Sequence, residues 1–247
     1  MTESSPFNYR YFVGHASKTG GRCLDYGCGY GTTVLIGRQQ DIDIWGADTF
    51  SGNYARWLTA VPSEVKDRVR KIESGRADFP DEHFDFVFSN QVLEHVTNPE
   101  AVIDDMCRLT KPGGTLITAF PVTETWYEGH IGLYFAHRFP KGSALRRYYF
   151  DLCHRAGLGI HRGKHSRETW VEKSGRTLDD VCFYYSRARM LRAVEKAFGA
   201  PVEDIAVNYM RTRLGARAGR LPPFADPLLR FVYHKRAGEI WCTRKSS

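Results

Sequence analysis

The chain has 247 residues, of which 42% are hydrophobic and 13% aromatic, an ordinary globular composition that is large enough to bury a substantial core. No apolar run approaches the roughly 18 residues of a membrane span, and no basic segment followed by an apolar one indicates a signal peptide. The six cysteines are scattered without a C-x-x-C pair, which predicts reduced thiols in a cytoplasm and argues against a zinc site.

The charge is divided unevenly along the chain. Residues 1–137 carry a net charge of −6 and residues 138–247 carry +13, within a total of +7. Two interpretations stay open. One is a solvated basic surface that aids solubility, and the other is attraction to an anionic partner such as an acidic glycan, a nucleic acid or a membrane surface.

Short apolar runs alternate with helical patterns over the first half of the chain, after a polar lead-in at residues 1–19 with aromatic residues able to pack across a ligand site. Strands are expected at about 22–26, 43–48, 69–73, 84–89 and 115–120. Helices are expected at about 32–40, at 53–60, and from Pro99, with Asn98 as N-cap, to the Pro112–Gly114 stop. Alternating strands and helices predict a parallel sheet that binds ligands at the carboxyl ends of its strands.

The pattern weakens beyond residue 120, where an aromatic, histidine-rich connection follows the fifth strand. Helices are expected at 146–156 and 182–198, an irregular polar insertion at 161–180, and the last strands at 205–210 and 240–244. The prediction is a single domain, in which a core of residues 1–160 is completed by a basic part at 161–247.

A glycine-rich turn at 22–31 (RCLDYGCGYG) follows the first strand and is the most informative segment of the chain. Glycines at every second position allow a sharp bend and the close approach of a ligand. Asp48 ends the next strand, where a carboxylate can accept both hydroxyls of a ribose. Asp25, two residues before the first glycine, would repel a pyrophosphate but suits a cationic ligand such as a sulfonium. The turn and the spaced acid together predict a nucleoside-containing cofactor.

These motifs resemble those of the class I S-adenosylmethionine (AdoMet) dependent methyltransferases. The likeness continues through 84–96 (FDFVFSNQVLEHV) and 111–117 (KPGGTLI) and covers about residues 20–160. It implies an α/β, Rossmann-like fold: a seven-stranded, mostly parallel sheet with helices on both faces, an antiparallel last strand and, here, a C-terminal insertion. It also implies AdoMet as cofactor and S-adenosylhomocysteine as product.

The resemblance implies a set of cofactor-binding residues spread over four strand ends. They are Asp25, Gly27, Cys28, Gly29, Gly31, Asp48, Thr49, Glu73, Ser74 and Asn90. Glu73 would contact the adenine amine, although the family more often has Asp before a small residue at that place. His95, in the LEHV run, is expected to be a core histidine.

The stretch at 126–140 (WYEGHIGLYFAHRFP) lies where acceptor-binding residues often occur in this fold, and it resembles methyltransferases encoded with bacterial surface-polysaccharide enzymes. A hydroxyl acceptor loses its proton as the C–O bond forms, and histidine is the usual base. We predict His130 as the base, oriented by Glu128, with His137 as second candidate. A packed aromatic loop with satisfied histidines is the alternative. The candidate substrate-binding residues are Trp126, Tyr127, Arg146, Arg147 and Tyr148.

The resulting prediction is O-methylation of a glycan, a glycan precursor or another small, anionic acceptor, with no metal. Three alternatives stay open: an RNA methyltransferase, a methyltransferase of a lipophilic molecule such as a quinone, and a non-catalytic AdoMet-binding protein. The RNA alternative lacks an N/D-P-P-Y/F/W motif after the fourth strand, and the arginine excess disfavours the quinone. Nucleic acid is therefore a disfavoured partner, whereas peripheral membrane contact stays open.

Overall fold

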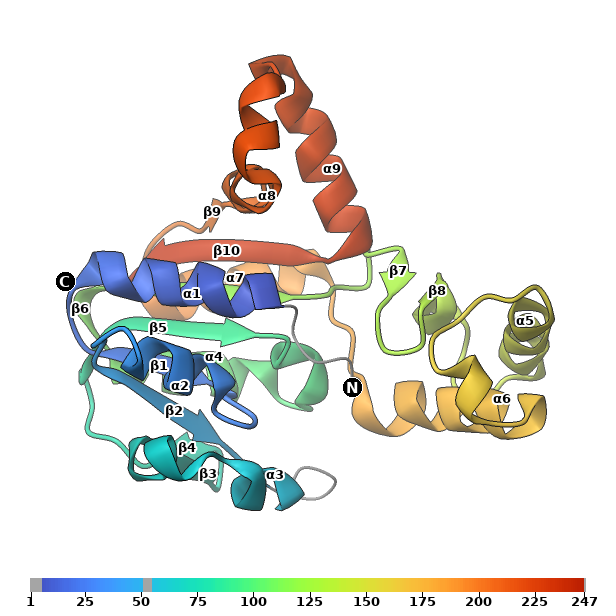
Figure 1. Cartoon of the computed structure of the whole chain (residues 1–247), viewed down its shortest axis with the longest axis horizontal. Coiled ribbons are helices and arrows are strands. Elements are labelled where there is room, and N and C mark those ends of the chain that lie inside the picture. Colours follow the sequence, from blue (N-terminus) through green and yellow to red (C-terminus); the bar gives the residue numbers. More distant parts are fainter. Residues whose placement is uncertain (1–5, 51–54, 247) are drawn as a thin grey trace.

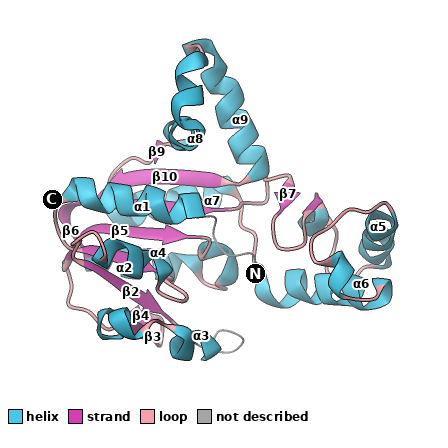
Figure 2. Ribbon diagram, in the orientation of Figure 1, coloured by secondary structure: helices cyan, strands magenta, loops and turns pink. Residues whose placement is uncertain are grey.

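The computed structural model describes residues 6–50 and 55–246. Within them, an eight-stranded sheet runs in the order β4-β3-β2-β1-β5-β6-β10-β9 (Figures 1 and 2). Its strands are β1 (Cys23–Tyr26), β2 (Ile44–Asp48), β3 (Val69–Glu73), β4 (Arg76–Ala77), β5 (Phe84–Asn90), β6 (Thr110–Phe120), β9 (Glu203–Asp204) and β10 (Glu239–Arg244).

The five central strands are parallel, whereas β10 runs antiparallel to β6. The predicted Rossmann-like architecture is therefore confirmed, including its antiparallel last strand. Two short edge strands, β4 and β9, enlarge the predicted sheet, and β6 begins at Thr110, before the Pro112–Gly114 segment that was expected to precede it.

Helices cover both faces of the sheet (Figure 1). α1 (Pro6–Thr19) and α2 (Thr32–Arg38) pack together, as do α4 (Pro99–Leu109) and α7 (Arg187–Phe198). α4 forms as predicted: the Asn98 side chain accepts a hydrogen bond from Ala101 N at 3.2 Å, and the helix buries Met106 and Leu109 completely. α3 (Ala55–Ala60) agrees with the helix expected at 53–60 over the residues that the structure describes, since residues 53 and 54 lie outside them. The remaining elements are the short turns Ser63–Arg68, Leu93–His95, Ala136–Arg138, Arg162–Lys164, Thr177–Val181, Gly215–Arg220 and Pro223–Ala225.

The expected polar lead-in is wrong, because residues 6–19 form helix α1. Phe12 is 2% exposed and stacks on Phe88 of β5, with 5.0 Å between ring centroids. Tyr11, on the same face, packs edge-on against Tyr209 at 4.9 Å. Burial of these aromatic side chains against the sheet and the C-terminal helices stabilises α1 and offsets the conformational entropy lost when the helix forms.

A small lobe lies beyond the carboxyl ends of the parallel strands (Figure 1). It consists of the hairpin β7 (Tyr127–Glu128) and β8 (Leu133–Tyr134) with α5 (Ala144–Arg155) and α6 (Arg167–Arg176). Its core includes Phe150 and Trp170. The irregular insertion expected at 161–180 is therefore wrong: α6 forms there, with Ser166 as N-cap accepting from Thr169 N at 3.3 Å.

The strand expected at 205–210 is also wrong, because α8 (Ala206–Leu214) occupies that position and pairs with α9 (Asp226–Arg236) in a projecting hairpin (Figure 1). Tyr209 packs on both α1 and Tyr233 of α9. The helix expected from residue 182 begins only at Arg187, after an extended segment. Among the described helices, none has the length and apolar character that crossing a bilayer requires.

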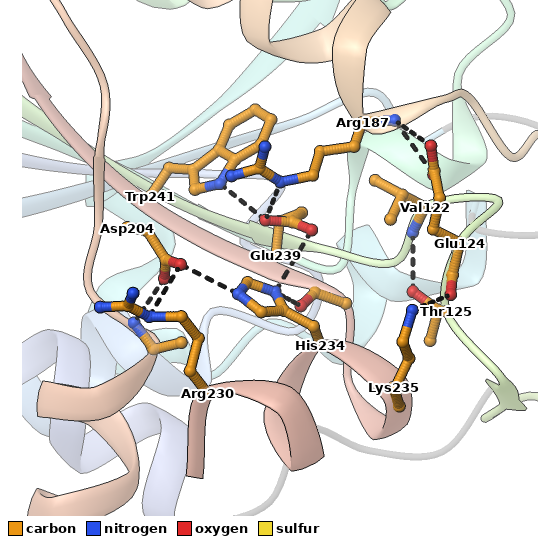
Figure 3. Close-up of polar contacts among 12 residues, drawn as sticks. Val122, Glu124, Thr125, Arg187, Asp204, Arg230, His234, Lys235, Glu239 and Trp241 are labelled. Carbon is orange, nitrogen blue, oxygen red and sulfur yellow. Dashed lines mark hydrogen bonds and ion pairs between the residues drawn. The ribbon is translucent and has the colours of Figure 1, made fainter. Parts of the chain in front are cut away.

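A partly buried polar network fixes α9 to the sheet (Figure 3). His234 of α9 contacts Asp204 through Nε2 at 2.9 Å and Glu239 through Nδ1 at 3.2 Å. Glu239 also accepts hydrogen bonds from Trp241 Nε1 and Arg187 Nε at 2.9 and 3.1 Å. The network therefore joins α9, α7 and the two last strands.

Candidate functional site

The glycine-rich turn between β1 and α2 has the conformation that its sequence predicts. Gly27, Gly29 and Gly31 have φ angles of 87°, 54° and 72°, which L side chains rarely adopt. A Cβ at residue 27 would lie 2.2 Å from a methyl group of Val92, so only glycine fits between the turn and the segment after β5. The backbone is thereby held close to the carboxyl ends of β1 and β2, where Gly27 N donates to Ala47 O at 2.7 Å.

Two carboxylates lie under this turn. Asp25 is 5% exposed, and burial, assisted by the charge of Asp48 and opposed by a hydrogen bond from Thr33, raises its pKa to about 7. Asp48 accepts hydrogen bonds from Gly29 N at 2.9 Å and Phe50 N at 3.2 Å, yet burial still raises its pKa. Two buried acids with raised pKa values favour a ligand that brings positive charge and hydrogen-bond donors.

The other predicted cofactor residues divide into two groups. Cys28 is 8% exposed within the turn, Thr49 follows Asp48, and Asn90 ends β5 at the same edge of the sheet. Glu73 and Ser74 instead lie on the exposed β3–β4 hairpin, where Glu73 pairs with Lys71 at 3.0 Å. The glycine turn, Asp48, Thr49 and Asn90 thus lie at one edge of the sheet, while cofactor binding by these residues and the adenine contact of Glu73 stay predictions.

The predicted acceptor side contains a buried cluster that joins the sheet edge to the lobe. Glu128 is 1% exposed, and its Oε1 receives hydrogen bonds from Nδ1 of His130 and from the Tyr184 hydroxyl, both at 2.6 Å. Nε2 of His130 lies 3.3 Å from Nε2 of His95, which follows β5 in the turn Leu93–His95. Glu128 and His130 thus lie in contact, while their catalytic roles stay predictions. His95, expected to be a core histidine, is part of this cluster.

Hydrogen bonding and burial set the charge states in this cluster. Burial opposes a charge on His130, but its bonds to the Cys182 sulfur and to Glu128 outweigh burial and raise its pKa to about 10. Burial lowers the pKa of His95 to about 4, and burial raises that of Glu94 to about 7. His130 as it stands is therefore an imidazolium near neutral pH, which does not suit the predicted role of base.

His137, the second candidate, is in a different state. Its Nε2 lies 3.4 Å from the Thr123 carbonyl oxygen, its Nδ1 is buried with no hydrogen-bond partner, and its ring packs 4.6 Å from that of Tyr184. Burial lowers its pKa, so the ring is neutral. With its hydrogen on Nε2, His137 presents a basic Nδ1.

The predicted substrate-binding residues do not gather around the histidines. Trp126 packs on Phe231 of α9 at 5.6 Å, and the guanidinium of Arg236 lies over Tyr127 at 3.9 Å. Arg146 is 3% exposed and forms an ion pair with Asp179 inside the lobe. Arg147 and Tyr148 lie exposed on α5. Acceptor binding by these five residues stays a prediction, and the structure gives Arg146 a packing role.

Sequence reasoning missed Cys182 and Tyr184, which were placed inside a helix. Both lie in the extended segment before α7, beside the turn that carries Glu94 and His95: Phe183 N donates to Glu94 O at 2.7 Å. The run of apolar residues at 181–185 was the available signal, since it lacks the charged positions that follow in α7.

Comparison with known proteins identifies this arrangement. The model of a family described as "Methyltransferase domain" matches residues 8–197. The chain belongs to this methyltransferase family. It is an AdoMet-dependent methyltransferase, and AdoMet is its cofactor.

Relatives of this methyltransferase span most of its length. It is 27% identical over 226 residues to a ubiquinone biosynthesis O-methyltransferase of Azoarcus sp. (strain BH72), covering 85% of this chain and 84% of that protein. It is 29% identical over 220 residues to the Nitrosococcus oceani protein of the same name, with the same coverage. The crystal structure of an AdoMet-dependent methyltransferase from Mesorhizobium loti shares the fold, with a TM-score of 0.52, 16% identity, and coverage of 96% and 95% of the two chains.

Proposed function

We propose that this methyltransferase transfers a methyl group to a hydroxyl oxygen of a small, largely apolar acceptor, such as a precursor of a quinone. The names of the Azoarcus and Nitrosococcus relatives, which extend over more than four fifths of both chains, support an O-methyltransferase of this kind. They favour the quinone alternative over the glycan acceptor expected from the sequence.

The single observation that carries the proposal is the continuity between the glycine turn and the histidine cluster. Val92 packs against Gly27, and the chain continues within three residues to Glu94 and His95, which meet His130 from the lobe. The cluster and the lobe therefore close the carboxyl edge of the sheet beside the cofactor turn. An acceptor held there would lie in line with the transferred methyl group.

Three residues of the chain would have separate roles in the reaction. Bound AdoMet supplies an activated methyl group on a sulfonium. Asp48 would hold the ribose hydroxyls, and Asp25 would balance the cofactor's positive charge. His137, with its neutral ring and unpartnered Nδ1, is the better candidate to accept the proton of the acceptor hydroxyl, and general-base catalysis adds roughly 10²–10⁴-fold to the rate.

The test is methyl transfer from labelled AdoMet to a set of acceptors: a dihydroxybenzoate with a prenyl chain, an acidic oligosaccharide and a generic RNA. Mass spectrometry of the products locates the methyl group. We expect O-methylation of the aromatic hydroxyl, and His137→Gln should lower kcat by roughly 10²–10⁴-fold while leaving AdoMet affinity unchanged. Methylation of only the oligosaccharide or the RNA would reject the proposed acceptor.

A further inference from the structure

The rings of His95 and His130 meet through the same nitrogen. Their Nε2 atoms are 3.3 Å apart, with the ring planes at 83°. Each Nδ1 contacts a pure acceptor, the Val181 carbonyl oxygen at 2.8 Å and a Glu128 carboxylate oxygen at 2.6 Å. Each Nδ1 therefore carries a hydrogen, and if neither ring bears a second proton the two Nε2 lone pairs face each other. Such a pair is stable only with a proton or a cation between the nitrogens.

The spacing of these nitrogens suits a metal ion. Two imidazole nitrogens, each about 2.05 Å from a tetrahedral zinc ion, are about 3.3 Å apart, which equals the separation found here. A ligand atom of Cys182 completes the group, and the donor atoms of all three residues lie within 4.8 Å of one another. Two imidazoles and a thiol form a donor set typical of zinc.

Glu94 gives a second, independent indication of a cation. Its side chain is fully buried, and both carboxylate oxygens lack a hydrogen-bond partner. One of these oxygens is 3.9 Å from Nε2 of His95. An unpaired buried carboxylate is strongly unfavourable, whereas a dication bound by one thiolate and lying beside one carboxylate forms a group without net charge.

The donors are also held in place before any metal binds. Hydrogen bonds on both sides of Cys182 tie its segment to the turn that carries Glu94 and His95: the Val181 oxygen accepts from His95, and Phe183 N donates to Glu94 O. Glu128 is held by the Tyr184 hydroxyl and by Ile131 N at 2.8 Å. A carboxylate and a carbonyl that orient the ligating histidines are the usual outer partners of a metal site.

We propose that His95, His130 and Cys182 bind one zinc ion beside the carboxylate of Glu94. The site would join the lobe, which supplies His130, to the sheet edge, which supplies Glu94 and His95. The sequence predicted no metal site. The three donors come from separate segments of the chain, so no short ligand spacing in the sequence could indicate the site. The inference does not depend on which acceptor is methylated, although zinc binding makes His130 a ligand rather than a base.

The test measures metal binding by the full-length protein without an acceptor. Elemental analysis of untagged protein after gel filtration should find about one zinc per chain. After removal of zinc with a chelator, titration with Co²⁺ should give the visible bands of a tetrahedral site and a sulfur-to-cobalt charge-transfer absorption. Cys182→Ser should abolish that absorption, whereas Cys153→Ser, at another buried free cysteine, should retain it. Glu128→Gln should weaken zinc binding roughly 10- to 100-fold.

If metal-free wild-type protein gives no visible absorption when it is titrated with Co²⁺, the proposal is overturned. His95 and His130 would then share a proton between their Nε2 atoms. Retention of the sulfur-to-cobalt absorption by Cys182→Ser would overturn the donor set. The wild-type cobalt spectrum decides the matter even where a variant fails to fold, which circular dichroism reveals. Zinc binding without methylation of a prenylated phenol would reject only the proposed acceptor, and the reverse result would reject only the metal.

Discussion

His234 should make the stability of this protein depend on pH. Both of its ring nitrogens face acceptors: Asp204 at Nε2, and the Gly238 carbonyl with Glu239 at Nδ1 (Figure 3). Both nitrogens therefore carry hydrogen, and the ring is charged. Burial opposes this charge, but the bonds to Asp204 and Glu239 outweigh it and raise the pKa of His234 to about 9.

The magnitude follows from that value. A rise from 6.5 to about 9 corresponds to about 3 kcal/mol of unfolding free energy, and solvent screens little of it because the side chain is 18% exposed. Since the pKa is raised on folding, this contribution is fully present below about pH 6.5, where the unfolded chain is also protonated, and it is lost as the pH rises through about 9.

Urea unfolding of the wild type and His234→Gln, followed by circular dichroism across this pH range, tests the reasoning. The stability difference between the two proteins should shrink by about 3 kcal/mol from the acidic to the alkaline end, because other titrating groups cancel. His165→Gln, at an exposed histidine, is the matched control and should change stability by less than about 0.5 kcal/mol. A difference for His234→Gln that stays constant with pH would refute a charged ring in this network.

Two further predictions concern the cofactor turn. Gly27→Ala should lower the free energy of unfolding, measured in urea, by about 2–5 kcal/mol, because its φ of 87° and the methyl group of Val92 both oppose a Cβ. The control Gly75→Ala, at a φ of 79° with open space around it, should lower it by only about 1–2 kcal/mol. Equal losses in the two variants would contradict the close approach of Val92 to Gly27. Asp48→Ala should weaken AdoMet binding about 10- to 100-fold in calorimetry, and unchanged affinity would reject the ribose contact.

The first half of the fold could be predicted because its signals are local. A strand followed by glycines with positive φ, as at Gly27, needs no distant residue to be recognised. The same holds for Asn98, whose side chain caps α4 as its position before Pro99 predicts. The type and order of the main elements over residues 22–120 could therefore be predicted from the spacing of apolar residues and from the glycines, prolines and helix caps between them.

The second half depends on tertiary contacts that override local pattern. The run at 205–210 is short and mostly apolar, as in a strand, but it forms a helix in which Tyr209 packs on Tyr11 and Tyr233. α6 buries little beyond Trp170 and Ser174, so its apolar face is too narrow to show a helical period. The charge excess of this half was likewise ambiguous. Arg189 pairs with Glu100 and Lys245 with Glu82, both in the first half, whereas Arg187, Arg211 and Arg230 pair with acids that the net charge of the second half already counts.

The candidate site shows the same division. The cofactor half could be predicted because its signal consists of one short segment, the glycine-rich turn at 22–31, and one acidic residue at the end of the next strand, Asp48. The proposed acceptor half depends on where Cys182 lies, and two hydrogen bonds fix that position: Phe183 N donates to Glu94 O, and the His95 side chain contacts Val181 O. Nothing in the sequence around His95 indicates a partner for it. Its ring meets that of His130 only because the folded lobe packs against the edge of the sheet. The chemistry of this half is therefore a property of the folded chain, set by contacts between segments nearly 90 residues apart.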